Sequence, residues 1–207
     1  MNAVAPVPSA TLRGQQREAS RAHIRKAART CFLRDGVGNV TMEAVAAEAG
    51  IRRATLYLYY PGKNALLLDL LEQSLRATDR IYLRLRDLPR LDLAAVRGWL
   101  AYYLREVEAH AGAVDLFRSA ILPDEKLRQL LREHSERTIE LLAPRYACFD
   151  LSGLTGAERE RRRFRAETLL ATIEQFCSEA RLADYHLDRE IGLDVLSEQL
   201  LAALAEA

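Results

Sequence analysis

An all-α fold is what this sequence predicts, and three observations support the prediction. Apolar residues recur every three or four positions along nearly the whole chain, and the alternation typical of strands is absent. The chain has 207 residues, and 49% of them are hydrophobic, which is enough to bury a core. No apolar run approaches the roughly 18 uncharged residues of a membrane span. We expect about nine helices and no contact with a membrane.

The first helix is expected from a serine cap at Ser20 to a glycine stop at Gly36. Residues 1–16 contain Pro6 and Pro8 among small residues, so we expect a flexible tail there. The tail lacks the long apolar segment of a secretory signal. The apolar stripe of the first helix consists of Ile24, Ala27, Ala28, Cys31 and Phe32.

Two short helices should follow, joined by a tight turn. Thr41 is expected to cap the first of them, with Glu43 in its favourable first turn. Gly50 suits the turn because glycine tolerates a positive φ. The second helix is expected over residues 52–59 and must end before Pro61. Such a pair has the helix-turn-helix geometry, which presents the start of its second helix to a major groove of DNA.

The remaining helices are predicted from periodicity and from caps. Asp92 can cap one of them, and Thr155 with Glu158 fits a capping box that would begin another. A loop is expected over residues 145–156. The expected helical ranges are 63–88, 92–112, 113–121, 123–144, 155–183 and 189–207.

Charge is distributed unevenly along the chain. Residues 1–65 hold ten basic and four acidic residues, whereas the rest hold 20 basic and 25 acidic ones. This asymmetry indicates an N-terminal part that meets a polyanion. Arg52, Arg53 and Thr55 begin the second helix of the pair, where an arginine can donate two hydrogen bonds to guanine. The alternative is a three-helix bundle whose basic surface never touches nucleic acid.

The stretch from Ser20 to Leu66 resembles the DNA-binding domain of the TetR (TetR/AcrR) family of bacterial transcriptional repressors. The resemblance implies a flexible tail over 1–16, a DNA-binding domain over 17–65, and a helical ligand-binding and dimerisation domain over 66–207. The residues that carry it are Ser20, Arg21, Ile24, Ala27, Ala28, Phe32, Gly36, Thr41, Val45, Ala46, Ala49, Gly50, Ile51, Thr55, Leu56, Tyr57, Tyr60, Pro61, Gly62, Lys63 and Leu66.

The resemblance also implies roles for single residues. Tyr57, Tyr59 and Lys63 would reach phosphates, which positions a protein on DNA without reading its sequence. Tyr60 would pack inward. The whole predicted DNA-binding set is Thr41, Arg52, Arg53, Thr55, Tyr57, Tyr59 and Lys63. Because Arg52 and Ala54 depart from the usual family pattern, no operator sequence is carried over from a relative.

Aromatic residues on two neighbouring expected helices suggest a pocket for an apolar or aromatic small molecule. The predicted ligand-binding residues are Trp99, Tyr102, Tyr103, Phe117 and Arg118. Trp99 and Tyr103 also lie on the apolar face of their helix, where ordinary core packing is the favoured interpretation.

The last two expected helices carry apolar faces larger than the edge of one domain needs. The predicted dimer interface is Leu169, Ile173, Phe176, Val195, Leu196 and Leu200. The resemblance implies that these helices pair with their twins in a four-helix bundle. Packing inside the monomer is the alternative.

These observations predict a homodimeric, ligand-responsive repressor that binds palindromic double-stranded operator DNA in the cytoplasm and is released by a small-molecule effector. Widely spaced cysteines, odd in number, favour reduced thiols. The sequence has no catalytic motif and no metal-ligand spacing, so we expect neither an enzyme nor a metal or other cofactor. The alternative function is a helical scaffold that binds a protein partner through its helix-turn-helix face.

Overall fold

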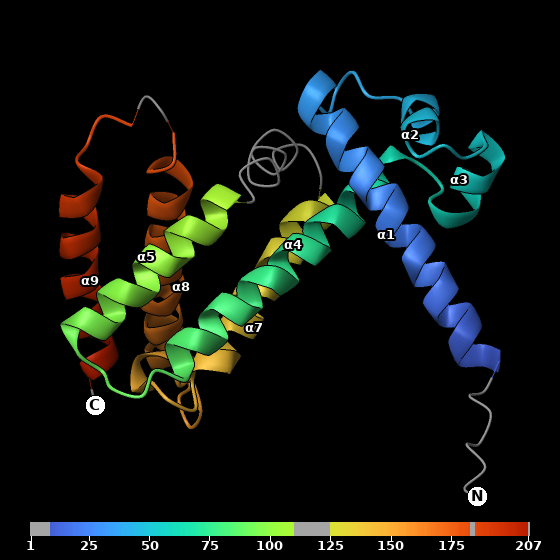
Figure 1. Ribbon diagram of the computed structural model, residues 1–207. Helices are drawn as coiled ribbons and strands as arrows, with labels where there is room; N and C mark the ends of the chain where they lie inside the picture. The colour runs from blue at the N-terminus through green and yellow to red at the C-terminus, as the bar shows by residue number, and fades with distance from the viewer. Residues whose placement is uncertain (1–8, 110–124, 183–184, 207) are drawn as a thin grey trace, which may run out of the picture. The chain divides into compact units, whose positions relative to one another are not determined.

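The computed structural model describes residues 9–109, 125–182 and 185–206 (Figure 1). Within these residues every regular element is a helix, which confirms the all-α class. The helix predicted at 113–121 lies outside the described residues. The elements are α1 Ser9–Asp35, α2 Met42–Glu48, α3 Arg53–Tyr59, α4 Lys63–Arg86, α5 Leu93–Ala109, α7 Glu125–Leu142, the 3-10 helix η1 Ala147–Phe149, α8 Gly156–Glu179 and α9 Arg189–Ala205.

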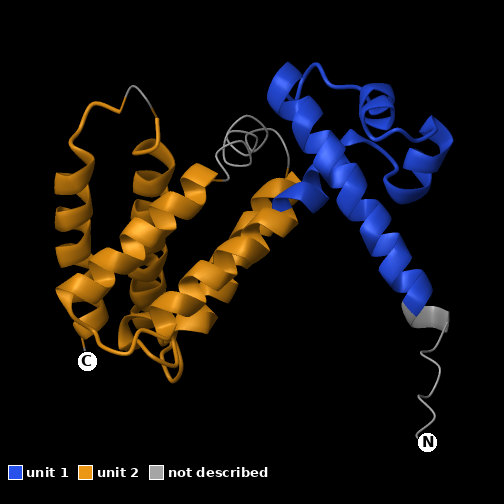
Figure 2. Ribbon diagram, in the orientation of Figure 1, with its two compact units in different colours: residues 1–71, 115–120 blue, residues 72–114, 121–207 orange. Residues whose placement is uncertain are grey.

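The described chain divides into two compact units (Figure 2). Unit 1 contains α1, α2, α3 and the first part of α4, up to Leu71. Unit 2 begins at Glu72 and contains the rest of α4 with α5, α7, η1, α8 and α9. The division at Leu71 and the domain boundary proposed at 65–66 both fall within α4.

Unit 1 is a small helical core built against α1. The predicted stripe of α1 is buried throughout, from Ile24 to Phe32. Val45 and Ala46 of α2 are buried against it, and Leu56 of α3 is fully buried. Because these residues recur at helical spacing, the pattern that predicted the helices also predicted this core.

The start of α1 differs from the prediction. The helix begins at Ser9 rather than Ser20, so residues 9–16, predicted as part of the tail, are helical. Ser20 does not act as a cap, because its hydroxyl donates to the carbonyl of Gln16 at 3.0 Å, inside the helix. A serine hydroxyl can cap the start of a helix or donate to a carbonyl one turn earlier inside it. The second arrangement occurs here, because the preceding residues are good helix formers and the helix begins before Ser20.

Most other helix ends are as predicted. Gly36 follows α1 with φ +76°, and Thr41 Oγ1 accepts a backbone N–H of α2 at 3.1 Å. Asp92 caps α5 with a bond of 2.9 Å. Thr155 occupies the N-cap of α8 but its side chain makes no capping bond, so the predicted capping box with Glu158 is wrong.

Unit 2 has a larger core, to which α4, α5, α7, α8 and α9 all contribute. Within this core, the buried Trp99 Nε1 donates to the carbonyl of Ile81 at 2.8 Å. The segment predicted as a loop after α7 contains η1, which buries Phe149. None of the described helices has the length and apolar character needed to span a bilayer.

Candidate functional site

The turn between α2 and α3 has the conformation that a helix-turn-helix needs. Gly50 adopts φ +61°, a value that L side chains rarely take. The N–H of Ile51 donates to the carbonyl of Ala46 at 3.0 Å and closes the turn. His23 of α1 lies 2.9 Å from the carbonyl of Ala49, so α1 is fastened to the same turn. The orientation of α3 is therefore fixed by backbone contacts.

Arg52 and Arg53 stand at the N-terminus of α3, and both are exposed. Arg53 Nε lies 2.8 Å from Glu43 Oε1 on α2. The guanidinium carbon also sits 5.4 Å from the ring centroid of Tyr57, within cation–π range. Glu43 and Tyr57 thus hold Arg53 in a defined position on the outer side of α3.

The three tyrosines in and directly after α3 differ in how far they are buried. Tyr60 is buried and Leu56 is fully buried, so both predicted core positions are confirmed. Tyr57 is exposed, and Tyr59 and Thr55 are half-buried. The contacts predicted between these side chains and DNA stay predictions.

Lys63 is the first residue of α4, and its ammonium has partners within the protein. Nζ donates to the carbonyls of Val37 at 2.8 Å and Gly38 at 3.1 Å. These bonds join the start of α4 to the loop that follows α1. An ammonium has three N–H donors, so a phosphate can be met by the third without breaking the other two.

A buried carboxylate that sequence reasoning missed holds α4 to α1. Asp69 Oδ2 accepts from Arg21 and Arg25, each at 3.2 Å, and from the hydroxyl of Tyr60. Burial alone would raise the pKa of Asp69, but the hydrogen bonds from Tyr60 and Arg25 and the nearby charges hold it below its ordinary value. No local sequence pattern predicts this cluster, because its members are separated by up to 48 positions.

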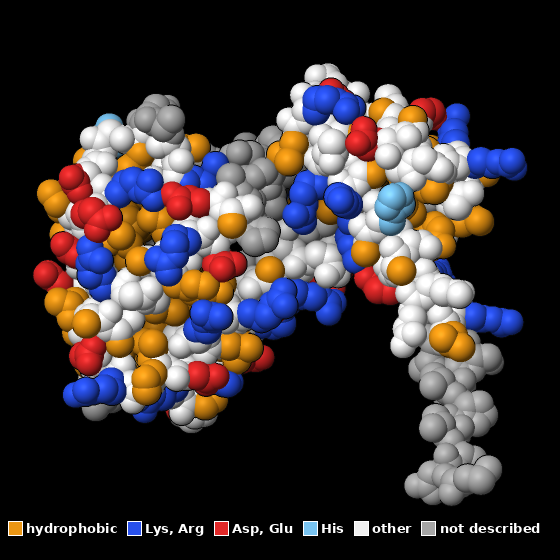
Figure 3. All heavy atoms as spheres, in the orientation of Figure 1, with side chains coloured by type: hydrophobic (Ala, Val, Ile, Leu, Met, Phe, Trp, Pro, Cys, Tyr) orange, Lys and Arg blue, Asp and Glu red, His pale blue; other side chains and the backbone are white. Residues whose placement is uncertain are grey.

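An exposed leucine also escaped the sequence analysis. Leu58 of α3 keeps 78% of its surface accessible. It lies at the edge of a hollow of about 790 Å³ lined by Arg13, Gln16, Arg17, Ala19, Ser20, Leu58 and Tyr59. Figure 3 shows Lys and Arg side chains spread over unit 1, with hydrophobic ones between them. An exposed apolar side chain beside cations suits a thymine methyl group next to phosphates.

Of the five predicted ligand-binding residues, Trp99, Tyr102 and Tyr103 belong to the described part of unit 2. Trp99 and Tyr103 are buried core residues whose rings pack at 5.7 Å, which confirms the favoured interpretation. Tyr102 is half-buried, and the guanidinium of Arg84 lies 4.2 Å from its ring centroid. Phe117 and Arg118 lie outside the described residues.

Three polar side chains that lie close together in unit 2, with His134 buried between the other two, were not predicted. His134 of α7 is buried, with Nδ1 3.2 Å from Asp79 Oδ1 and Nε2 3.9 Å from Glu174 Oε1. Tyr82 donates its hydroxyl to Glu174 Oε1 at 3.3 Å. We call Asp79, His134 and Glu174 the buried polar set. A single histidine carries no metal-site signal in sequence, and no described group of His, Cys, Asp and Glu has a metal-binding arrangement.

The predicted dimer residues fall on both sides of α8 and α9. Ile173, Leu196 and Leu200 are buried in the core of unit 2, so for these three the alternative of packing inside the monomer holds. Leu169 and Phe176 are half-buried, and Val195 is exposed. Phe164 and Ile191 are further exposed apolar side chains on these two helices.

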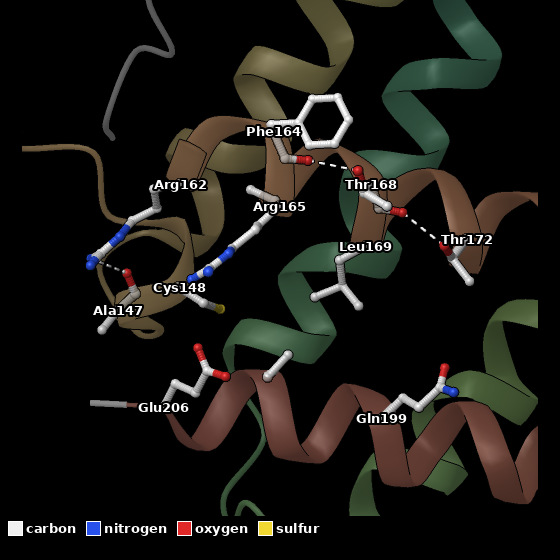
Figure 4. Close-up of a pocket in the computed structure, with 12 residues that line it drawn as sticks. Ala147, Cys148, Arg162, Phe164, Arg165, Thr168, Leu169, Thr172, Gln199 and Glu206 are labelled. Atoms are coloured by element: carbon white, nitrogen blue, oxygen red, sulfur yellow. Dashed lines mark hydrogen bonds between the residues drawn. The ribbon is translucent and has the colours of Figure 1, made fainter. Parts of the chain in front are cut away.

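An open groove of about 510 Å³ runs between α8 and α9 (Figure 4). Phe164, Thr168 and Thr172 line it from α8, and Gln199 and Ala203 from α9. These positions repeat every four residues, so each helix presents one continuous face. Ile191 and Val195 extend the α9 stripe at the same spacing. We call these seven residues the α8–α9 face.

Residues 24–70 match the sequence profile of a family described as bacterial regulatory proteins, tetR family. A search of curated proteins finds no match. The profile match agrees with the expectation that the chain is not an enzyme, since the family consists of regulatory proteins.

Solved structures of TetR-type regulators share the fold over nearly the full chain. The fatty acid degradation regulator FadR from Bacillus halodurans has a TM-score of 0.65 and 16% identity, covering 91% of this chain and 97% of the other. A TetR-like regulator from Rhodococcus sp. RHA1 has a TM-score of 0.59 and 23% identity, covering 98% and 100%. The TetR family repressor FadR from Thermus thermophilus, in complex with lauroyl-CoA, has a TM-score of 0.58 and 20% identity, covering 90% of this chain and 95% of the other. The resemblance to the TetR family is confirmed, in sequence for the N-terminal segment and in fold beyond it.

Proposed function

We propose that this TetR-family protein is a transcriptional repressor, that it binds palindromic operator DNA as a homodimer in the cytoplasm, and that a small-molecule effector releases it. The helix-turn-helix of unit 1 carries the proposal. Its second helix begins with two exposed arginines, Arg52 and Arg53. The start of that helix is the part that enters a major groove in this class of domain.

The roles of the side chains follow from their exposure and chemistry. Arg52 and Arg53 would read base edges, where a bidentate contact to guanine discriminates by about 1–3 kcal/mol. Tyr57, Tyr59 and Lys63 would bind phosphates and set the register. Thr41 and Thr55 would lie at the edge of the same surface. The pair between Glu43 and Arg53 positions the arginine before DNA arrives.

Two copies of α3 are needed to read a palindrome. The α8–α9 face supplies a candidate surface for pairing, because it is continuous over two helices and carries the exposed apolar side chains Phe164, Ile191 and Val195. A two-fold dimer would place two recognition helices about 34–36 Å apart on successive major grooves. Leu169 and Phe176, half-buried on α8, would contribute at its margin.

Release by an effector requires coupling between the two units. Helix α4 is continuous from Lys63 in unit 1 to Arg86 in unit 2, so it belongs to both. An effector that binds unit 2 and favours the DNA-free state weakens DNA binding, and DNA then weakens effector binding by the same factor. The neighbour from Thermus thermophilus, solved with lauroyl-CoA, supports a small molecule as the effector.

The test is a gel-shift titration of the purified protein against DNA flanking its own gene, repeated at several salt concentrations. A repressor should give a band that resists competitor DNA, with a steep loss of affinity as salt rises. The protein-scaffold alternative predicts no specific band and little dependence on salt. A shift abolished equally by any competitor DNA would contradict operator recognition.

A second measurement tests the proposed dimer interface. Val195→Asp places a charge on the exposed α8–α9 face and should shift the protein from dimer to monomer in sedimentation velocity. Operator affinity should fall with it. A variant that stays dimeric would exclude this face.

A further inference from the structure

We propose that the effector of this protein is an organic cation, and that the buried polar set of unit 2 binds its protonated nitrogen. The inference rests on the proposed ligand-responsive function and names the chemical class of the ligand. None of Asp79, His134 and Glu174 is among the ligand-binding residues that the sequence predicted.

The set converges from three helices. Asp79 comes from α4, His134 from α7 and Glu174 from α8. His134 stands between the two carboxylates, with its nitrogens 3.2 Å from Asp79 Oδ1 and 3.9 Å from Glu174 Oε1. Residues far apart in sequence thus direct their polar atoms toward one point.

Several polar atoms of the set are buried without hydrogen-bond partners. Only 5% of the His134 side chain is exposed, yet neither ring nitrogen has a hydrogen-bond partner. Asp79 Oδ1 is also buried without one. Buried polar atoms are nearly always paired, because leaving them unpaired costs free energy. The neutral ring has one nitrogen that accepts and one that donates, so a ligand with N–H donors would satisfy Asp79 Oδ1 and the accepting nitrogen of His134.

The set can be reached from its carboxylate side. The side chains of Asp79 and Glu174 keep 25% and 43% of their surface accessible. Burial nevertheless raises the pKa of Glu174 to about 7, against the opposing hydrogen bond from Tyr82. Glu174 is therefore close to other protein atoms while part of its side chain stays accessible.

The charges around the set favour a cation. Burial lowers the pKa of His134, with Asp79 opposing the change and Arg137 adding to it, so the ring is neutral at pH 7. Burial also raises the pKa values of Tyr82 and Tyr103 well above normal, and that of Cys177 to about 12. Apart from Arg137, the groups here that can carry charge are the two carboxylates, and a cation would favour the ionised form of Glu174 whereas an anion would oppose it.

The remainder of the ligand should be apolar or aromatic. Tyr82 bonds to Glu174 and packs against Tyr103 at 5.6 Å and Trp99 at 5.8 Å, so an aromatic wall adjoins the polar set. Carboxylate and imidazole acceptors match the N–H groups of an amine or amidine. A protonated nitrogen attached to a ring meets both requirements.

Three probes of nearly equal size test the charge requirement: benzamidine as the cation, benzamide as the neutral analogue and benzoate as the anion. Binding to the full-length protein is measured by isothermal titration calorimetry at pH 7.5. Benzamidine should bind at least tenfold more tightly than either analogue. Equal or tighter binding of benzoate would overturn the proposal.

Variants place the binding site. Asp79→Asn and Glu174→Gln keep the side-chain shape and should each weaken benzamidine at least tenfold. Glu140→Gln removes an exposed carboxylate from α7 and should leave binding unchanged. Circular dichroism confirms that the variants fold. Undiminished binding by both Asp79→Asn and Glu174→Gln would contradict the assignment.

Proton release gives a readout that a structural role would not move. A cation beside Glu174 lowers its pKa from about 7, so binding near pH 7 should release protons, and titrations in buffers of different ionisation enthalpy measure this. Glu174→Gln should abolish the release. The same preparations are assayed for operator binding. A specific band without cation binding sinks this inference alone, and cation binding without any band sinks the proposed function.

Discussion

Asp69 and Asp79 lie on the same helix, one in each unit, and their surroundings are opposite. Asp69 is 8% exposed, and its Oδ2 is bonded to Tyr60, Arg21 and Arg25. Asp79 has a buried oxygen without a hydrogen-bond partner, close to a histidine whose nitrogens lack one too. Each carboxylate has a buried oxygen, and only that of Asp69 has hydrogen-bond partners within the protein.

The difference separates a structural role from a binding role. A fully bonded carboxylate fixes the geometry of the elements it joins, here α1 and the start of α4. A carboxylate with an unbonded buried oxygen raises the free energy of the folded protein, because that oxygen has lost water without gaining a partner. A ligand that donates a hydrogen bond to the oxygen lowers this free energy again. In unit 1 the bonded carboxylate therefore holds the start of α4 against α1, while unit 2 has buried polar atoms that remain available.

The largest expected effect comes from removing the satisfied carboxylate. Asp69→Ala leaves two arginines and a tyrosine without their acceptor, and should lower the free energy of unfolding by about 3 kcal/mol, as the loss of one partner in a buried ion pair does. Urea denaturation followed by circular dichroism measures it. Asp79→Ala, the matched change on the same helix, should cost less than about 1 kcal/mol. Similar losses for both would break the comparison.

The effect of Asp69→Ala should also depend on pH. The pKa of Asp69 is held below its ordinary value of 3.8, so its stabilisation is fully present above that pH and is lost as the pH falls through the lower, native value. The difference between wild type and variant should therefore shrink in acid. A constant difference between pH 7 and pH 2 would show that the ionised form is not what matters.

The next effect concerns the side chains that unit 1 holds outward. Arg53→Ala should weaken operator binding by about 2 kcal/mol and relax the preference at one base pair, if Arg53 reads a base. Lys63→Ala should instead weaken all DNA sequences alike and reduce the salt slope by about 1. Fluorescence anisotropy with operator and scrambled duplexes separates the two. An equal loss on both duplexes for Arg53→Ala would reassign it to phosphate.

A smaller effect is expected at Glu174 in unit 2. Burial raises the pKa of Glu174 to about 7, so between about pH 4.5 and pH 7 the native state keeps a proton that the unfolded chain has lost. The stability of the native state is therefore highest, as far as Glu174 is concerned, below about pH 4.5, and this stability is lost as the pH rises through 7. Glu174→Gln should therefore stabilise the protein above pH 7, by about 1 kcal/mol once screening at its accessible surface is allowed for. Urea denaturation at pH 5 and pH 8 measures it. A variant less stable than wild type at pH 8 would contradict this.

The smallest effect compares two threonines at N-cap positions. Thr41→Ala removes a real capping bond from α2 in unit 1 and should cost about 0.5–1 kcal/mol. Thr155→Ala removes a side chain that makes no such bond to α8 and should cost less than about 0.5 kcal/mol. Urea denaturation of both variants checks the order. A larger cost at Thr155 would mean that its hydroxyl caps α8 in solution.

The sequence by itself determined the elements whose causes are local. Gly36, Gly50 and Pro61 set backbone conformations within one or two residues, and the predicted helix ends at these positions are confirmed. The buried stripe of α1 followed from spacing alone. Ser20 was misjudged because its hydroxyl can bond forward as a cap or backward within a helix, and the local pattern does not decide between them.

Only the tertiary structure decided which polar and apolar side chains meet. Asp69 joins partners up to 48 positions away, and Glu174 accepts from Tyr82 across 92 positions. Periodicity marked α8 and α9 as apolar but could not tell that Leu200 faces inward while Val195 stays exposed. The spacing of apolar residues shows which face of a helix is buried, but not which other helix packs against that face. The bonded carboxylate of unit 1 and the unpaired polar atoms of unit 2 therefore arise only when helices distant in sequence pack together.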